Sequence, residues 1–384
     1  MRPASADALI PGSERPGEGR PGERRSGTAG GSEAGAAARA LGSVRWAGAT
    51  PTGRERGPEA VVATLIETLV SLRERSIAAG LAPVAVGVAV PGLVDETTGV
   101  ARHSVNLGWQ DLPLRDRIEE QLGLPVALAN DVRAGGLAEA QLLGRDDVLF
   151  VPIGTGIAAA HVRNGEAAPG AHGAAGELGH VVVRPGGRAC PCGRRGCLEA
   201  EASAAAVEAI YAAALRPPPE RAPAAGSTAA DGSSAPIDPT SPLPPGAPSS
   251  RTPTGAAPAA PAAPAAASAG GGASPEADGQ PTVTAAEIAR RVAAGEPLAA
   301  AVWQRVVEAL ADGLMIASAL LDPDVIVIGG GLAQAGETLF SALRTALDER
   351  RTFLPMPAVV PAALGDRAGC TGAALLAARI APPR

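Results

Sequence analysis

The sequence predicts an α/β fold with mostly parallel sheets, and three observations support this prediction. Apolar runs of strand length alternate along the chain with longer amphipathic stretches. Several of these runs end on glycine or a carboxylate, as strands do at the binding edge of an open α/β sheet. Hydrophobic residues make up 46% of the 384 residues, which is enough to build two lobes of ordinary size.

The first half of the chain contains three helical and three extended patterns. A helix is expected over 59–79, and a buried strand over 84–90 ends where Pro91 and Gly92 mark a turn. The patterns that follow are a helix over 113–123, a strand over 125–131, a helix over 132–144 and a strand over 147–154.

The second half shows the same alternation after a long interruption. A long helix is expected over 299–321, a buried strand over 324–331 and a further helix over 337–350. The strand ends in three consecutive glycines, which places a turn at its carboxyl end.

Two tracts lack the apolar residues that a core needs. Residues 1–40 contain almost no large apolar side chain, and residues 216–280 are rich in Pro, Ala, Ser and Gly. Such segments bury too little surface to offset their ordering entropy, so both are expected to be disordered. The second tract would be a flexible insertion between two helices.

Composition and charge narrow the class of protein. The chain contains no lysine and only 2% aromatic residues, and its formal net charge is -6. A negative balance argues against nucleic acid as the main partner. No apolar run approaches the ~20 residues of a membrane helix. We therefore expect a soluble, cytoplasmic protein that binds neither membrane nor nucleic acid.

One histidine and three cysteines lie within eighteen residues, in the pattern His-x9-Cys-x-Cys-x4-Cys. The ligands would be His180, Cys190, Cys192 and Cys197. This closed set of one imidazole and three thiolates suits a structural, tetrahedral zinc ion. The alternative is a disulfide with one spare thiol, but no apolar leader segment opens the chain to support export. Cys370, near the C-terminus, is expected to be a buried small hydrophobe.

The residues around this zinc knuckle, 180–197, resemble a known family. GAHGAAGELGH followed by CPCGRRGCLE is similar to the signature of the ROK family, bacterial sugar kinases and sugar-responsive repressors. The resemblance runs from about Gly42 to the C-terminus with one interruption. It implies an actin-like ATPase (ribonuclease H-like) fold with lobes at 41–150 and 151–384, the last helix packing back on the first lobe.

The resemblance implies a catalytic base at Asp131. A sugar hydroxyl that attacks a γ-phosphate must lose a proton, and a positioned carboxylate can accept it. Without the family context, an aspartate directly after a strand is more often a helix N-cap. Both roles remain open at this point.

The resemblance also assigns residues that bind the sugar. Hydroxyl groups need donors and acceptors in fixed directions. The implied set is Asn106, Asn130, Asp131, Glu177, His180 and Glu199. One ring nitrogen of His180 would bind zinc and the other would face the sugar, so that the ion holds the loop that presents both glutamates.

Two glycine-rich turns are expected to bind ATP as its Mg²⁺ complex. Gly154, Thr155 and Gly156 resemble the second phosphate loop of the family, although Ala158–Ala160 stand where more glycine is usual and could tighten the loop. A second loop, formed by Gly329, Gly330 and Gly331, resembles the adenosine loop.

The chain departs from the family pattern at its start. The family's D-x-G-G-T phosphate hairpin has no counterpart, since the nearest match, at 27–31, follows no strand. The resemblance resumes at 40–53, which is similar to the third strand of the first sheet. We therefore hypothesise that the N-terminus is a wrong start or a frameshifted stretch. As written, the first lobe would lack two strands.

Several functions are compatible with this pattern. The first is an ATP-dependent sugar kinase, most simply a glucokinase that acts on the 6-hydroxyl of a hexose, and the resemblance suggests a homodimer or homotetramer. The second is a non-catalytic or truncated sugar-binding protein, which the missing hairpin favours. A repressor would need an N-terminal helix-turn-helix, but 1–40 has no helical period. A zinc-knuckle nucleic-acid binder would need aromatic residues beside Arg188, Arg194 and Arg195.

Overall fold

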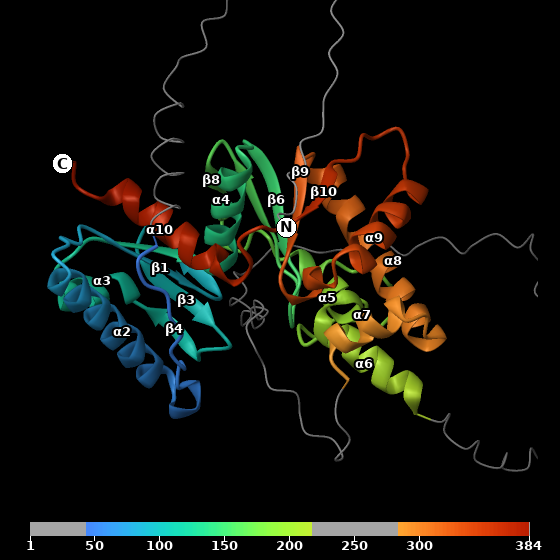
Figure 1. The fold of residues 1–384 in the computed structure, drawn as a ribbon, viewed down its shortest axis with the longest axis horizontal. Helices are drawn as coiled ribbons and strands as arrows, with labels where there is room; N and C mark the ends of the chain where they lie inside the picture. Colours follow the sequence, from blue (N-terminus) through green and yellow to red (C-terminus); the bar gives the residue numbers. More distant parts are fainter. Residues whose placement is uncertain (1–43, 217–282, 384) are drawn as a thin grey trace, which may run out of the picture.

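The computed structural model describes residues 44–216 and 283–383, which form two lobes side by side (Figure 1). The first tract predicted to be disordered, 1–40, lies outside the described residues. So does nearly all of the second, 216–280. The α/β class is confirmed, since helices and strands alternate along most of both lobes.

The first lobe contains two small sheets and two helices. Strands β1 (Val86–Val90) and β5 (Val126–Asn130) pair in parallel, with Val90 opposite Asn130. The antiparallel sheet consists of β2 (Leu93–Asp95), β3 (Val100–Ser104) and β4 (Trp109–Leu112). The helices are α2 (Pro58–Ala78) and α3 (Leu114–Leu122), preceded by a single 3-10 turn η1 (Arg54–Arg56).

The resemblance suggested a strand at 40–53, and the described part of that segment, 44–53, does not form one. Residues 44–53 have no regular secondary structure. Pro51 removes one backbone donor, and Gly53 takes a left-handed conformation with φ 68°, which ends any extended run there.

The second lobe is built on a five-stranded mixed sheet in the order β10-β9-β6-β7-β8. These strands are β6 (Asp147–Pro152), β7 (Ala160–Arg163), β8 (Glu166–Ala167), β9 (Val325–Gly329) and β10 (Ala358–Pro361). Its α-helices are α5 (Leu198–Ala202), α6 (Ala204–Leu215), α7 (Ala285–Ala293), α8 (Pro297–Leu321) and α9 (Glu337–Glu349). The 3-10 turns are η2 (Leu178–His180), η3 (Gly331–Ala335) and η4 (Gly365–Arg367).

Two helices form the layer between the sheets. Helix α4 (Asp131–Leu143) packs on β6 and β7 of the second sheet, while α10 (Ala368–Ile380) packs on β1 of the first and against α4 (Figure 1). Glycine makes this close packing possible, since a Cβ at Gly372 would overlap the Ala134 carbonyl. The start of α4 therefore lies at the junction of the two lobes.

Replacing Gly372 by alanine should destabilise the protein by about 1–3 kcal/mol, because the added methyl group must push α10 away from α4. Urea unfolding followed by circular dichroism measures this change. Gly369→Ala is the matched control on the same helix, since its Cβ would meet only ordinary contacts, the nearest at 3.7 Å. Equal stability of the two variants would contradict the close packing.

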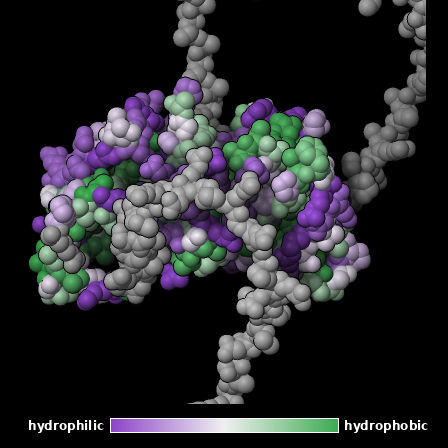
Figure 2. Space-filling view, turned by 90° about the horizontal axis from the view of Figure 1, so that it is seen from above, coloured by the Kyte–Doolittle hydropathy of each residue, from purple (hydrophilic) through white to green (hydrophobic). Residues whose placement is uncertain are grey.

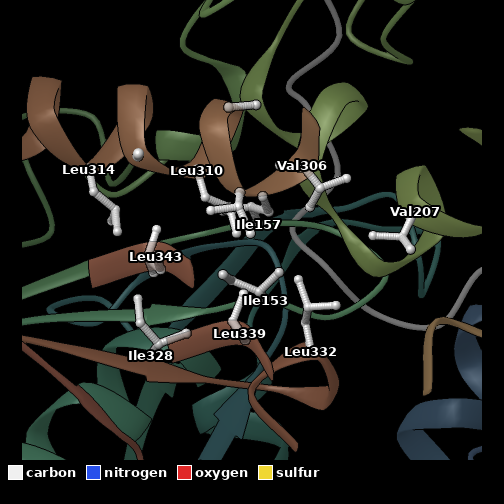
Figure 3. Packing of buried hydrophobic residues seen from close by; sticks show 14 of the residues in the cluster. Ile153, Ile157, Val207, Val306, Leu310, Leu314, Ile328, Leu332, Leu339 and Leu343 are labelled. Atoms are coloured by element: carbon white, nitrogen blue, oxygen red, sulfur yellow. The ribbon is translucent and has the colours of Figure 1, made fainter. Parts of the chain in front are cut away.

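The main hydrophobic core lies in the second lobe, between its sheet and helices α6 to α9 (Figure 3). Ile153, Ile328 and Leu339 are fully buried there, as is Leu310 of α8 at 1% exposure. A separate core in the first lobe packs α2 and α3 on the small sheets. The strands of each lobe are thus held by the core of that lobe.

The surface is mixed in character. Polar residues cover much of the face seen from above, with apolar residues scattered among them (Figure 2). In the described part of the chain, no helix has both the length and the apolar content needed to cross a membrane. The expectation that Cys370 is buried is wrong: it is exposed, because it lies on the face of α10 opposite Ala368 and Gly372.

Candidate functional site

The carboxyl ends of the parallel strands meet at the lobe junction. Val90 of β1 lies beside Asn130 of β5 in one lobe, and Pro152 of β6 lies beside Gly329 of β9 in the other. The predicted catalytic turn and both predicted glycine loops therefore lie at strand ends, as ligand sites in α/β sheets do.

Asn130 is the N-cap of α4. Its side-chain oxygen accepts hydrogen bonds from the backbone N–H groups of Val132 and Arg133, both at 3.0 Å. Its amide nitrogen donates to the Gly92 carbonyl at 3.0 Å and to Asp131 Oδ1 at 3.2 Å. These four contacts use the full capacity of an asparagine side chain. Asn130 thus orients the turn, and a direct contact with a sugar would have to replace one of them.

Asp131 is the first residue of the helix rather than its cap. Its Oδ1 accepts from the Val132 N–H at 2.9 Å, while Oδ2 forms no hydrogen bond with the described residues. Burial raises the pKa of Asp131, opposed by the N–H groups of Val132 and Asp131 and by the nearby Arg133 guanidinium. A carboxylate with a raised pKa and one free oxygen can act as a general base.

A polar pocket lies directly in front of this turn. Its lining includes Gly92, Asn130, Arg133, Gly173, Gly176 and Glu177. The pocket encloses about 10 Å³, the room of one water molecule. The loop of residues 170–177, called the sugar loop below, forms one wall of this pocket.

Glu177 and Glu199 form a second acidic pair beside this pocket. Burial raises the pKa of both side chains, and the charge of Glu199 raises that of Glu177 further. Glu199 Oε2 accepts the Ile157 N–H at 3.0 Å, which ties α5 to the turn after β6. Glu177 Oε2 lies 3.8 Å from Nε2 of His180. The two carboxylates therefore lie near enough for the charge of one to act on the other.

His180, Cys190, Cys192 and Cys197 form one compact cluster. Their ligand atoms all lie within 4.8 Å of one another. The His180 Nδ1 to Cys190 Sγ and the Cys192 Sγ to Cys197 Sγ distances are both 3.6 Å. Zinc–sulfur bonds of about 2.3 Å in a tetrahedron separate two sulfurs by about 3.8 Å, so the donor set fits zinc. All four cysteines of the chain are free thiols, and 3.6 Å is too long for a disulfide.

The cluster is held by its own loop. Arg194 donates to the His180 carbonyl at 2.9 Å, and the N–H of Cys190 donates to the Arg194 carbonyl at 2.8 Å. Burial raises the pKa of the Cys190 thiol to about 12. A buried thiol of this kind becomes a thiolate only with a cation beside it, which agrees with a metal-binding role.

The two glycine loops touch each other. The N–H of Ile153 donates to the Gly329 carbonyl at 2.9 Å, and the N–H of Leu332 donates back to the Ile153 carbonyl at 3.1 Å. Thr155 is exposed, and within the described residues no partner is recorded for its backbone N–H or for that of Gly156. These donors are available to an anion such as a phosphate group.

The remaining predicted residue is Asn106, and it lies apart from the pocket lining. Residues 105–108, which include Asn106, form the turn between β3 and β4. Two residues of the network around the pocket were not predicted from the sequence, namely Arg133 and Glu96. The only signal for Arg133 was a charged residue within a helix of small and apolar residues, VRAGGLAEA.

The chain is similar in sequence to known proteins of one family. The model of the ROK family matches residues 36–234 and 264–380. The glucokinase of Thermotoga maritima is 30% identical over 327 residues, which cover 83% of this chain and 86% of that protein. A putative xylose repressor of Caldicellulosiruptor sp. strain Rt8B.4 is 42% identical over 121 residues, but these cover only 31% of this chain and 30% of that protein.

A solved structure is also similar along most of the chain. The crystal structure of a ROK hexokinase from Thermus thermophilus superposes with a TM-score of 0.62 at 30% sequence identity. The match covers 86% of this chain and 89% of that one. The likeness therefore includes both lobes and the strand ends between them.

Proposed function

Because the chain belongs to the ROK family, we propose that it is an ATP-dependent sugar kinase, most simply a glucokinase that phosphorylates the 6-hydroxyl of a hexose. The observation that carries the proposal is Asp131, a partly buried carboxylate with a raised pKa at the strand end where the two lobes meet. The acidic pair Glu177 and Glu199 supports a polyhydroxylated substrate.

The proposed reaction is an in-line phosphoryl transfer. The sugar hydroxyl oxygen forms a bond to the γ-phosphorus while the bond from that phosphorus to the β,γ-bridging oxygen breaks. Asp131 takes the hydroxyl proton, and ADP leaves with the bridging oxygen. Outward movement of the sugar loop would admit the hexose, and its return would exclude water, which competes as an acceptor.

ATP would bind across the two glycine loops as its Mg²⁺ complex. The backbone N–H groups of Thr155 and Gly156 would donate to the phosphates, and the loop at Gly329–Gly331 would lie along the adenosine. Within 44–216 and 283–383, the only group of three or more metal-binding side chains is the histidine–cysteine cluster. Mg²⁺ typically binds through substrate phosphates, water and one or two carboxylates, and so needs no such group.

Zinc would have a structural role. Bound zinc would fix the four side chains of His180 and the three cysteines in one geometry. Glu199 follows Cys197 by two residues and Glu177 precedes His180 by three, so both acidic side chains start from backbone anchored by the cluster.

A second candidate is a non-catalytic sugar-binding protein of the same family. The missing D-x-G-G-T hairpin favours it, because that hairpin carries the terminal phosphate contacts that the resemblance implies. The sugar-binding residues would then persist without transfer chemistry.

The two candidates differ in sugar-dependent ADP release. The purified chain, with zinc retained, would be assayed with Mg²⁺, ATP and in turn glucose, mannose and N-acetylated hexosamines. ADP release that depends on one of these sugars supports the kinase and identifies the sugar. Sugar binding by calorimetry without ADP release would refute the kinase and support the second candidate.

A further inference from the structure

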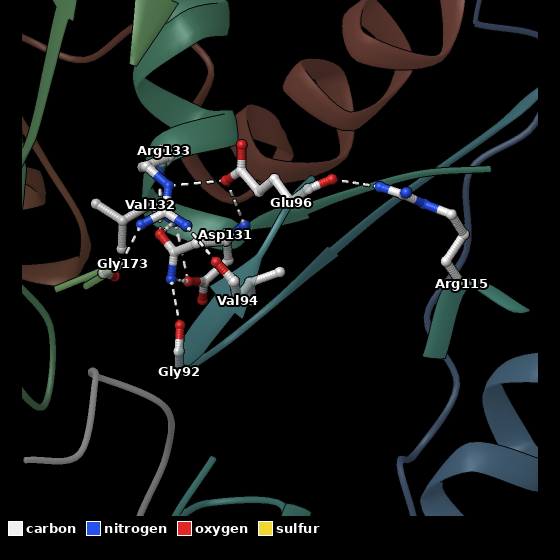
Figure 4. A network of polar contacts seen from close by, with 9 residues as sticks. Gly92, Val94, Glu96, Arg115, Asp131, Val132, Arg133 and Gly173 are labelled. Atoms are coloured by element: carbon white, nitrogen blue, oxygen red, sulfur yellow. Dashed lines mark hydrogen bonds and ion pairs between the residues drawn. The ribbon is translucent and has the colours of Figure 1, made fainter. Parts of the chain in front are cut away.

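Arg133 is a buried cation at the centre of a polar network (Figure 4). Its side chain is only 4% exposed. Its Nε donates to Glu96 Oε1 at 2.8 Å, Nη2 donates to the Val94 carbonyl at 3.2 Å and Nη1 donates to the Gly173 carbonyl at 3.3 Å. One guanidinium group thus binds two separate segments besides its own helix.

These segments are distant in sequence and meet at the pocket. Val94 and Glu96 belong to β2 and the turn after it, Gly173 belongs to the sugar loop, and Arg133 lies in the first turn of α4. Arg133, Gly173 and Gly92, which precedes β2, are among the residues that line the pocket. The guanidinium therefore fixes the relative position of three walls of that pocket.

Glu96 extends the network to the catalytic turn. The same Oε1 that pairs with Arg133 accepts the backbone N–H of Asn130 at 3.3 Å. Arg115 of α3 donates to the carbonyl groups of Glu96 and Thr97 and so fixes the turn that carries this carboxylate (Figure 4). A shift of Arg133 or Glu96 would therefore shift the backbone next to Asp131.

The bonds differ in strength. The pair with Glu96 is a charge-assisted hydrogen bond with one buried partner, whereas the bond to Gly173 is long. The sugar loop can therefore leave Arg133 while the β2 turn stays attached. The link from Arg133 to the sugar loop is thus the weaker of the two, and the link to the β2 turn is the stronger.

We infer that Arg133 is a positioning residue for the sugar site. It holds the sugar loop in register with the Asn130–Asp131 turn, so that the substrate hydroxyl meets the carboxylate. The inference rests on the proposed function and adds a residue that controls sugar affinity without being the base. Small displacements of such supports cost large factors in rate, about 100-fold for 1 Å.

Three variants test this role. Arg133→Met keeps a long side chain but removes its charge. Arg133→Lys keeps the charge but loses the planar guanidinium with its several N–H donors. Glu96→Gln removes the negative charge of the oxygen that accepts from Arg133. Arg102→Met is the matched control, because Arg102 forms a 2.8 Å ion pair with Asp95 in the same small sheet but is 49% exposed.

We expect Arg133→Met to raise the sugar KM and the sugar Kd from calorimetry by about 10-fold or more, with the ATP KM unchanged. Arg133→Lys should recover part of the loss. The double variant with Glu96→Gln should be no worse than Arg133→Met alone, because the contact that Glu96→Gln weakens is already absent in Arg133→Met. Arg102→Met should leave both sugar constants unchanged.

Two results would overturn the inference. If Arg133→Met lowers the melting temperature but leaves the sugar KM and the sugar Kd unchanged, Arg133 has a purely structural role. A lower sugar KM in Arg133→Met would make it a latch that keeps the site closed.

Amide hydrogen exchange separates this inference from the proposed function, because it needs no turnover. In the full chain, Arg133→Met should speed exchange in the sugar loop and at Asn130 relative to Arg102→Met. Faster exchange at these positions, in a protein that phosphorylates no sugar, would refute the kinase and keep the positioning role. Unchanged exchange there would refute the positioning role whatever the activity.

Discussion

Replacing Asp131 by asparagine should lower kcat by about 100- to 10,000-fold, the range that a general base contributes. Asparagine has the same shape as aspartate, and its amide oxygen can still accept the Val132 N–H. An amide cannot accept the hydroxyl proton, however. Steady-state ADP release with saturating sugar and ATP measures the change. Sugar Kd should change much less than kcat, because the base acts in the transition state.

The wild-type pH profile should carry the signature of the same carboxylate. A base works only when ionised, so kcat/KM should fall as the pH drops through the pKa of Asp131. Because burial raises that pKa, the acidic limb should lie above the value of about 3.9 found for an ordinary aspartate. The residual activity of Asp131→Asn should lack this limb.

The free energy of unfolding and the activity should depend on pH in opposite directions. The folded state binds the Asp131 proton more tightly than the unfolded state, so this group adds stability as the pH falls through its raised pKa. At neutral pH its buried charge is a cost, and Asp131→Asn should be at least as stable as the wild type. Asp146→Asn, an exposed aspartate beyond the other end of α4, is the control and should alter neither property. A kcat within tenfold of wild type in Asp131→Asn would exclude Asp131 as the base.

The strands and helices that carry the site were predictable because their signals are local. The strand ending at Asn130 and the strand ending at Gly329 were placed correctly, since each is a short apolar run closed by polar or glycine residues. The small sheet of β2, β3 and β4 was missed. Its strands are only three to five residues long and alternate irregularly between buried and exposed positions.

The site itself was predictable where its members are close in sequence. The histidine–cysteine cluster follows from spacing, because glycine turns bring the thiols together within one loop. That Asp131 is not the helix cap needed the structure, which gives the cap to Asn130. The pairing of Arg133 with Glu96 joins residues 37 positions apart through a hairpin that the sequence did not reveal.

Replacing Cys197 by serine should release the metal and destabilise the second lobe. Cys197 is fully buried and is the N-cap residue of α5, whose Glu201 is also fully buried and pairs with Arg305 at 2.8 Å. Structural zinc contributes about 10–16 kcal/mol in isolated zinc-finger peptides. If even about 4 kcal/mol of that is lost, the melting temperature should fall by about 8–16 °C. Metal content by mass spectrometry and thermal unfolding measure both effects.

Sugar affinity should fall with the metal, because both ends of the cluster anchor backbone that leads to Glu177 and Glu199. Cys370→Ser is the matched control: this cysteine is exposed and outside the cluster, so metal content, melting temperature and sugar Kd should all stay at wild-type values. A contrary result would be a wild-type protein that is purified without zinc and melts at the same temperature as Cys197→Ser. That result would show that packing and hydrogen bonds alone hold the four side chains. Zinc at one equivalent in wild type and Cys370→Ser, with loss in Cys197→Ser, would instead make metal loading a condition for every kinetic measurement on this chain.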